Sequence, residues 1–202
     1  MDSRPLVVAH DGSMYAEHVG LPAYVSALGV PAQLALLDPA DRLPEYAANP
    51  AYARRLACQL LPALAPTGPV LGVGASLGGL AMLYAHRRYP GAFAGLFLQS
   101  GSFFDPALDP QEASRFAHFA EVTAFVASVV RNDRPVPPVP VVITCGLAEE
   151  NLANNRQLAA VLRAQGYPVD LVEVAGGHHH DTWRAALDPA FGVLLRRVAD
   201  SG

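Results

Sequence analysis

Short apolar runs alternate with longer amphipathic segments along the whole chain. The short runs are mostly continuous in hydrophobicity and are bounded by Gly, Pro or Asp, as expected of parallel strands that are buried on both faces. They predict strands at Leu6–Ala9, Gln33–Leu37, Val70–Gly74, Gly95–Gln99, Val139–Cys145 and Val169–Val174. The segments between them predict helices at roughly Met14–Leu28, Tyr52–Leu64, Gly78–Arg88, Gln111–Val130, Leu152–Gln165 and Thr182–Ala199. This alternation predicts the α/β class, with a doubly wound, mostly parallel sheet of about six strands and helices on both faces.

Local signals refine two of these helices. Gly166 follows the fifth helix at the position where a left-handed cap is wanted. In the second helix, Leu56, Leu60 and Leu64 recur every four residues and give it one face to bury, and we expect Pro62 to kink it. No repeat, low-complexity tract or linker divides the sequence. We therefore expect a single domain over residues 1–202.

Composition excludes several classes of protein. Hydrophobic residues make up 51% of the 202 positions, which is enough for a substantial core. The net charge of −4 and the lack of a basic block argue against a nucleic-acid partner. No apolar stretch has the length of a signal peptide or a membrane span, so we expect a cytoplasmic protein that does not bind membranes. Cys58 and Cys145 each lie within an apolar pattern and are predicted to be buried free thiols, with a disulfide as the alternative.

The third predicted strand runs into a cluster of glycines around one serine. Gly74-Ala75-Ser76-Leu77-Gly78 has the G-x-S-x-G pattern of a nucleophile elbow, in which a tight strand-to-helix turn exposes the serine hydroxyl above the sheet. In such a turn the Leu77 N–H points to where an oxyanion forms. The alternatives are a glycine-rich turn with a passive serine or a phosphate-binding loop. The lysine of a P-loop is missing and the spacing G-x-G-x-x-G does not occur here, which favours the elbow.

A serine nucleophile needs a histidine base, which in this fold class follows the serine and the acid in the chain. His86 and His118 fall within predicted helices, whereas three consecutive histidines, His178 to His180, follow the last strand at the correct sheet edge. A metal site is the alternative for such a triplet, but adjacent residues rarely converge on one ion. We therefore predict neither a metal nor an organic cofactor.

The acid is expected after the predicted strand Val139–Cys145, the last but one, where Glu149 and Glu150 follow Gly146. Glu149 is the preferred candidate and Glu150 the second. A glutamate here also stabilises the first turn of the next helix, so a site without an acid, or with another carboxylate, stays open.

Several of these motifs together resemble the esterase family of α/β-hydrolases that includes enterochelin esterases, S-formylglutathione hydrolases and mycolyltransferases, and most of all its enterochelin-esterase branch. The resemblance runs nearly end to end and is carried by His10-Asp11-Gly12, by the segment from Asp41 to Tyr46 with Asn49 and Tyr52, by the elbow from Gly74 to Leu80, by Gln99-Ser100-Gly101-Ser102, by Gly146 with Glu149, and by Gly177-His178 with Trp183-Arg184. The spacing from His178 to Trp183 selects this histidine over its two neighbours.

The resemblance implies hydrolysis of a small-molecule carboxylic ester on an α/β-hydrolase-like fold. It assigns Ser76 as nucleophile, His178 as base and Glu149 as acid, with the Leu77 and Ser13 N–H groups as oxyanion donors. Arg42 and Glu45 are expected either to contact substrate or to form a surface salt bridge.

Transfer of the acyl group to an alcohol, and a catalytically idle binding protein on the same scaffold, are the alternative functions. From this sequence we expect neither the antiparallel strands that open an α/β-hydrolase nor the N-terminal domain of the siderophore-cleaving members. The expectation is therefore ester hydrolysis in general, and whether siderophore esters are cleaved stays open.

Overall fold

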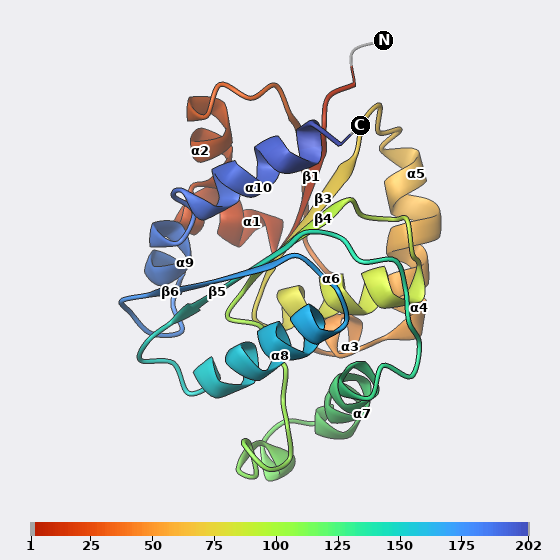
Figure 1. Ribbon diagram of the computed structural model, residues 1–202, viewed down its shortest axis with the longest axis vertical. Coiled ribbons are helices and arrows are strands. Elements are labelled where there is room, and N and C mark those ends of the chain that lie inside the picture. The colour runs from red at the N-terminus through yellow and green to blue at the C-terminus, as the bar shows by residue number, and fades with distance from the viewer. Residues whose placement is uncertain (1–2, 202) are drawn as a thin grey trace.

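In the computed structural model, which describes residues 3–201, parallel strands form one sheet in the order β2-β1-β3-β4-β5-β6 (Figure 1). The strands are β1 (Leu6–His10), β2 (Gln33–Leu37), β3 (Val70–Ala75), β4 (Gly95–Gln99), β5 (Val141–Gly146) and β6 (Val169–Val174). Every neighbouring pair is parallel, so all carboxyl ends lie along one edge. From β1 the chain adds β2 on one side of the sheet and then β3 to β6 on the other side. The sheet is therefore doubly wound, which confirms the predicted fold class.

Helices cover both faces of the sheet (Figure 1). One face carries α1 (Gly12–Met14), η1 (Tyr15–Val19), α2 (Leu21–Ala27), α9 (His180–Ala185) and α10 (Ala190–Ala199). The other carries α3 (Arg42–Tyr46), α4 (Pro50–Arg55), η2 (Leu56–Leu60), α5 (Leu61–Ala63), α6 (Leu77–Arg88) and α8 (Leu152–Ala164), with η3 (Glu112–Ser114) and α7 (Phe119–Val130) further out. Each face has its own apolar core, because side chains alternate between the two sides of every strand.

Three predicted helices are interrupted or shorter in the structure. The first is interrupted at Gly20, which has φ 76° and is followed by Pro22. The last is interrupted before Pro189, between α9 and α10. The fourth is helical only from Phe119, apart from the short turn η3. The prediction of one long helix was wrong in each case.

The second predicted helix changes its winding where Pro62 was expected to kink it. This helix begins at Pro50, earlier than predicted, because the Asn49 side chain accepts hydrogen bonds from the N–H groups of Ala51 and Tyr52. The wider π-helical turn η2 then directly precedes α5, which contains Pro62. Proline lacks the N–H that would continue the regular ladder, which accounts for the local rearrangement.

Smaller predictions have mixed outcomes. Gly166 has φ 87° after α8, which confirms the left-handed cap. Both cysteines are free, and Cys145 is buried as predicted, but Cys58 is exposed, because it faces away from the leucines that pack α4 and η2 onto the sheet. No helix among residues 3–201 has the length and apolar character needed to cross a membrane.

Candidate active site

Ser76 lies on a sharp turn between β3 and α6. Its φ of 55° and ψ of −123° belong to a region that residues with a side chain rarely occupy. The surrounding hydrogen bonds hold it there. Its N–H donates to the Gln99 carbonyl at 2.8 Å, and its own carbonyl accepts from the N–H groups of Gly79, Leu80 and Ser102. This conformation lifts the serine side chain above the carboxyl end of β3, in the middle of the sheet.

The turn brings α6 so close to β3 that side chains on the flanking glycines would collide with their surroundings. A Cβ on Gly74 would lie 2.4 Å from the carbonyl carbon and oxygen of Gly78, which is far inside van der Waals contact. A Cβ on Gly78 would lie 3.2 Å from His10 and Asp11. A Cβ on Gly79 would lie 3.1 Å from the Gly74 carbonyl oxygen. The glycine cluster therefore has a steric cause at each of these positions.

His10 supports the start of α6 from below. It is fully buried, its Nδ1 pairs with the Gly78 carbonyl at 3.0 Å, and its Nε2 pairs with the Tyr52 hydroxyl at 2.8 Å. Burial lowers the pKa of the imidazole to about 4, so the ring is neutral and donates one of these bonds while accepting the other. Sequence reasoning gave His10 no such role.

Glu149 and His178 lie on neighbouring loops, after β5 and β6. His178 Nδ1 is 2.8 Å from Glu149 Oε2. The glutamate side chain is 0% exposed and that of the histidine 40%. Burial raises the pKa of the Glu149 carboxyl, but hydrogen bonds from His178, Ser100 and the Gly146 N–H outweigh it and leave the pKa below its usual value. An ionised Glu149 therefore holds the imidazole through Nδ1, and no hydrogen bond within residues 3–201 engages Nε2.

The other oxygen of Glu149 is fixed by residues that the sequence analysis did not place in the site. Oε1 accepts from Ser100 Oγ and from the Gly146 N–H, both at 2.7 Å. Ser100 in turn accepts from Trp183 Nε1 at 2.9 Å, and the Trp183 ring meets the His178 ring edge-on at 5.3 Å. Both residues belong to stretches that carry the family resemblance, which is the one sequence signal that pointed to them.

Ser76 and His178 face two cavities together, but no hydrogen bond among residues 3–201 joins them. Ser76 Oγ pairs instead with Ser102 Oγ at 3.0 Å. One cavity, of about 190 Å³, is lined by Ser76, His178 and mostly polar groups that include Glu112 and Glu150. The other, of about 410 Å³, contains Ser76 and His178 together with Asp11, Met14, Arg42 and Trp183. Ester-sized groups therefore have room on both sides of the serine.

The structure brings Arg42 to this place but not Glu45. Arg42 donates from Nε and Nη2 to the two carboxylate oxygens of Asp11, at 2.8 and 2.9 Å, at the wall of the larger cavity. Glu45 lines neither cavity, because its carboxylate accepts from Arg55 at 2.7 Å and from the Ala40 N–H at 3.2 Å. Both residues form salt bridges, Arg42 with Asp11 and Glu45 with Arg55, but only Arg42 does so at the wall of a cavity that contains Ser76.

The two predicted oxyanion donors differ in their surroundings. Leu77 is the first residue of α6, so its N–H has no acceptor within the helix. The Ser13 N–H, in contrast, donates to Asp38 Oδ1 at 3.0 Å, and the Ser13 hydroxyl also donates to this carboxylate. The Ser13 amide thus already holds a negatively charged oxygen, and Met14 rather than Ser13 lines the cavity.

Within residues 3–201, one group of side chains has the donor set for a metal ion. His179, His180 and Asp181 each place a ligand atom within 4.8 Å of the others, and the His18 ring stacks on His180 at 4.9 Å. Arg184 lies 3.6 Å from Asp181, where its positive charge opposes a cation. The group lines neither cavity that contains Ser76. A site that works without a metal therefore stays our prediction.

Comparison with known proteins agrees with the motifs. The family model described as "Putative esterase" matches residues 5–194. The chain belongs to this esterase family. A relative from Dickeya dadantii (strain 3937), "Iron(III) enterobactin esterase", is 30% identical over 208 residues, which cover 95% of this chain and 48% of that protein. A relative of the same name from Escherichia coli (strain K12) is 26% identical over 92% of this chain and 48% of its own length. The chain thus spans about half the length of the curated relatives it matches.

A solved structure of the esterase family shows the same fold. The crystal structure of the enterobactin esterase from Shigella flexneri, determined in the presence of enterobactin, superimposes with a TM-score of 0.79 at 24% identity. The match covers 98% of this chain and 52% of that one. At this level of identity the likeness establishes an α/β-hydrolase-like fold.

The close approach at the elbow predicts that substitution of one β3 glycine, Gly74, lowers the stability of the protein far more than substitution of another, Gly72. Gly74→Ala would drive a Cβ into the Gly78 backbone, so we expect a severe loss of stability or of soluble protein. Gly72→Ala is the matched control, because its Cβ would meet only ends of the side chains of Leu96, Met82 and Phe93, at 3.1 Å. Urea unfolding of both variants tests this. Equal and mild losses would show that α6 does not depend on the glycine contact.

Proposed function

We propose that this protein is a serine hydrolase that cleaves small carboxylic esters through an acyl-enzyme intermediate. The observation that carries the proposal is that a strained serine at the start of α6 lines the same two cavities as His178, whose Nδ1 is held by the buried Glu149. Membership of the esterase family supports the reaction class. No metal or organic cofactor takes part in the proposed chemistry.

In the first half-reaction, Ser76 Oγ attacks the acyl carbon and His178 Nε2 accepts the hydroxyl proton. A serine hydroxyl is a weak nucleophile without such a base. Glu149 keeps the imidazole proton on Nδ1 through its 2.8 Å bond and stabilises the imidazolium once it forms. The Leu77 N–H, with Ser13 as the second donor, stabilises the oxyanion. The imidazolium then protonates the departing alcohol.

In the second half-reaction, water attacks the acyl-enzyme with His178 again as base, and Ser76 leaves with its proton restored. Both steps require Ser76 Oγ to rotate from Ser102 toward His178. Hydrogen bonds between catalytic groups are often long or poorly aligned before substrate binds. Ser102 then becomes free to bond with the substrate.

The substrate is proposed only as a class. The named relatives are enterobactin esterases, but the chain covers about half of their length. The smaller cavity presents the carboxylates of Glu112 and Glu150, and the guanidinium of Arg42 is neutralised by Asp11. These charges favour neutral or cationic esters over anionic ones. Neutral p-nitrophenyl acetate is therefore the test substrate.

The nucleophile and base are tested by three single variants. Ser76→Ala and His178→Ala should each lower kcat by up to about 10⁶-fold, because members of such a triad act as a unit. His179→Ala is the control and should retain most activity, because that side chain is exposed and contacts Asp181 instead of Glu149. Initial rates with p-nitrophenyl acetate, together with thermal melts, measure this. A folded Ser76→Ala protein with near-native turnover would overturn the proposed function.

The acid is tested by replacing the carboxylate of a glutamate with the neutral amide of glutamine. Glu149→Gln removes the charge that orients His178, so kcat should fall by about two to four orders of magnitude. Glu150→Gln is the matched control and should change kcat little with a neutral ester, because its exposed side chain makes no bond to His178. A selective loss at Glu150 would move the role to that residue. Equal, mild losses would indicate a serine–histidine dyad.

The role of Ser13 is tested through Asp38. If the Ser13 N–H receives the oxyanion, the Asp38 carboxylate competes for it, so Asp38→Ala should raise kcat several-fold. Asp41→Ala is the control, because it removes the same charge from the same loop without touching Ser13. A loss of activity in a stable Asp38→Ala protein would contradict this role and show that Asp38 positions the loop.

A further inference from the structure

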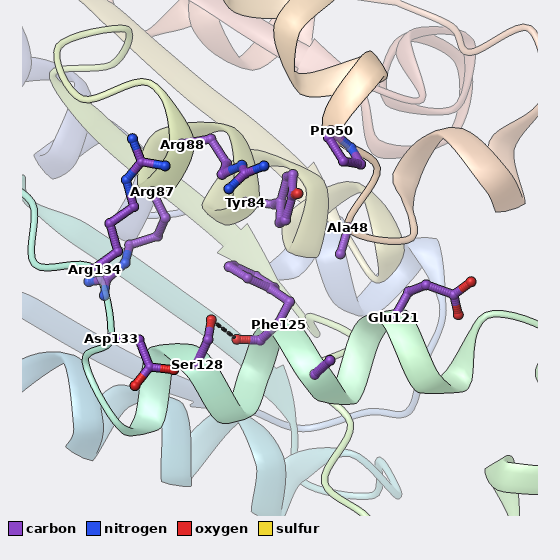
Figure 2. Close-up of a pocket in the computed structure, with 11 residues that line it drawn as sticks. Ala48, Pro50, Tyr84, Arg87, Arg88, Glu121, Phe125, Ser128, Asp133 and Arg134 are labelled. Atoms are coloured by element: carbon purple, nitrogen blue, oxygen red, sulfur yellow. Dashed lines mark hydrogen bonds between the residues drawn. The ribbon is translucent and has the colours of Figure 1, made fainter.

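A separate cavity of about 500 Å³ lies between the second half of α6 and α7, with the turn before α4 at its edge (Figure 2). It shares no lining residue with the two cavities that contain Ser76. Its volume falls within the range of small-molecule binding sites, about 300–1,000 Å³. The proposed ester hydrolysis makes no use of it.

One wall of this cavity is apolar and aromatic. The rings of Tyr84 on α6 and Phe125 on α7 meet edge-to-face, with their centroids 4.8 Å apart. Ala48 and Pro50 extend the surface from the segment that leads into α4. A flat apolar group laid against this wall would contact both rings.

Three arginines gather on one side of these rings, as Figure 2 shows. The Arg88 guanidinium lies over the Tyr84 ring, 5.6 Å from its centroid. Arg87 is 4% exposed, and its hydrogen bonds go to neutral acceptors, on Gln165, Tyr167 and Asn132. Arg134 follows α7. Among residues 3–201, none of the three pairs with a carboxylate, so one face of the cavity carries three uncompensated positive charges.

The acidic residues at the rim do not offset this charge. Glu121 lies on the opposite side of the rings from the arginines (Figure 2), and its carboxylate is 3.6 Å from His118 Nδ1. Asp133 also lines the cavity, but its carboxylate is already paired with Arg131 at 2.6 Å, and Arg131 is not a lining residue. The positive end therefore stays open to a negatively charged group from a ligand.

We propose that this cavity binds a small amphipathic anion. The apolar body of the ligand rests on Tyr84 and Phe125, and its carboxylate or other planar anionic group lies between Arg88 and Arg134. The planar guanidinium matches such groups with two parallel hydrogen bonds, and the buried charge of Arg87 adds a fixed attraction. Arginines also occur at the ends of helices simply because they complement the helix dipole. Failure of the ligand to bind would favour that explanation.

The probe is 2-naphthoate, with the neutral 2-naphthamide as its matched analogue, titrated by calorimetry into the wild-type protein. We expect saturable binding of the naphthoate and at least about tenfold weaker binding of the amide. The double variant Arg88→Gln/Arg134→Gln should lose a similar factor, whereas Arg197→Gln, an exposed arginine of α10 that lies on the other face of the sheet and does not line the cavity, should bind as the wild type does.

Both substituted arginines are exposed, so the fold is expected to survive, which thermal melts verify. Amide chemical-shift mapping on the wild-type protein locates the ligand without any substitution. Shifts at α6 and α7 support the proposal, and shifts confined to the loops after β3, β5 and β6 overturn it. Equal binding of the two probes, equal binding to the double variant, or no saturable binding would overturn it as well.

Discussion

The near-contact between β3 and the first turn of α6 is the constraint on which the site depends. Backbone atoms of Gly74 and Gly78 approach so closely that neither position has room for a larger side chain without displacement. This approach forces Ser76 into φ 55° and turns its hydroxyl outward at the carboxyl edge of the sheet. Strain of this kind costs about 1–3 kcal/mol and persists only where the surroundings fix it. Here the bond from Ser76 to Gln99 of β4 and the buried His10 beneath Gly78 provide that support.

A second requirement is that a buried carboxylate keeps its charge. Glu149 is removed from water, which alone would favour its protonated form. Three donors compensate, and one of them, Ser100, is itself held by Trp183 from α9. Ser100 also has a positive φ, of 50°, and its N–H donates to Thr144 of β5. Two strained serines thus mark the ends of adjacent strands, and the second of them orients the acid that orients His178.

The sequence predicts the framework well because the framework rests on local pattern. Gln33–Leu37, Gly95–Gln99 and Val169–Val174 have the same bounds in sequence and structure, since each is an apolar run closed by turn residues. The proximity of the candidate residues could be foreseen from the parallel topology, which brings the loops after β3, β5 and β6 to one edge. The break near Pro62 was expected from the proline itself, whereas those near Gly20 and Pro189 depend on local geometry that hydrophobic periodicity does not contain. The bonds from Trp183 to Ser100 and from Ser13 to Asp38 join distant segments, and only the folded chain reveals them.

The central claim is that Ser76, and not its neighbour Ser102, is the activated nucleophile. The two hydroxyls lie 3.0 Å apart and line the same cavity, so loss of activity on substitution alone does not separate their roles. Reaction of the wild-type protein with a fluorophosphonate, followed by intact-mass measurement and peptide mapping, does so directly. The account predicts one adduct per chain on Ser76. An adduct on Ser102, or none with a protein that hydrolyses esters, would contradict it.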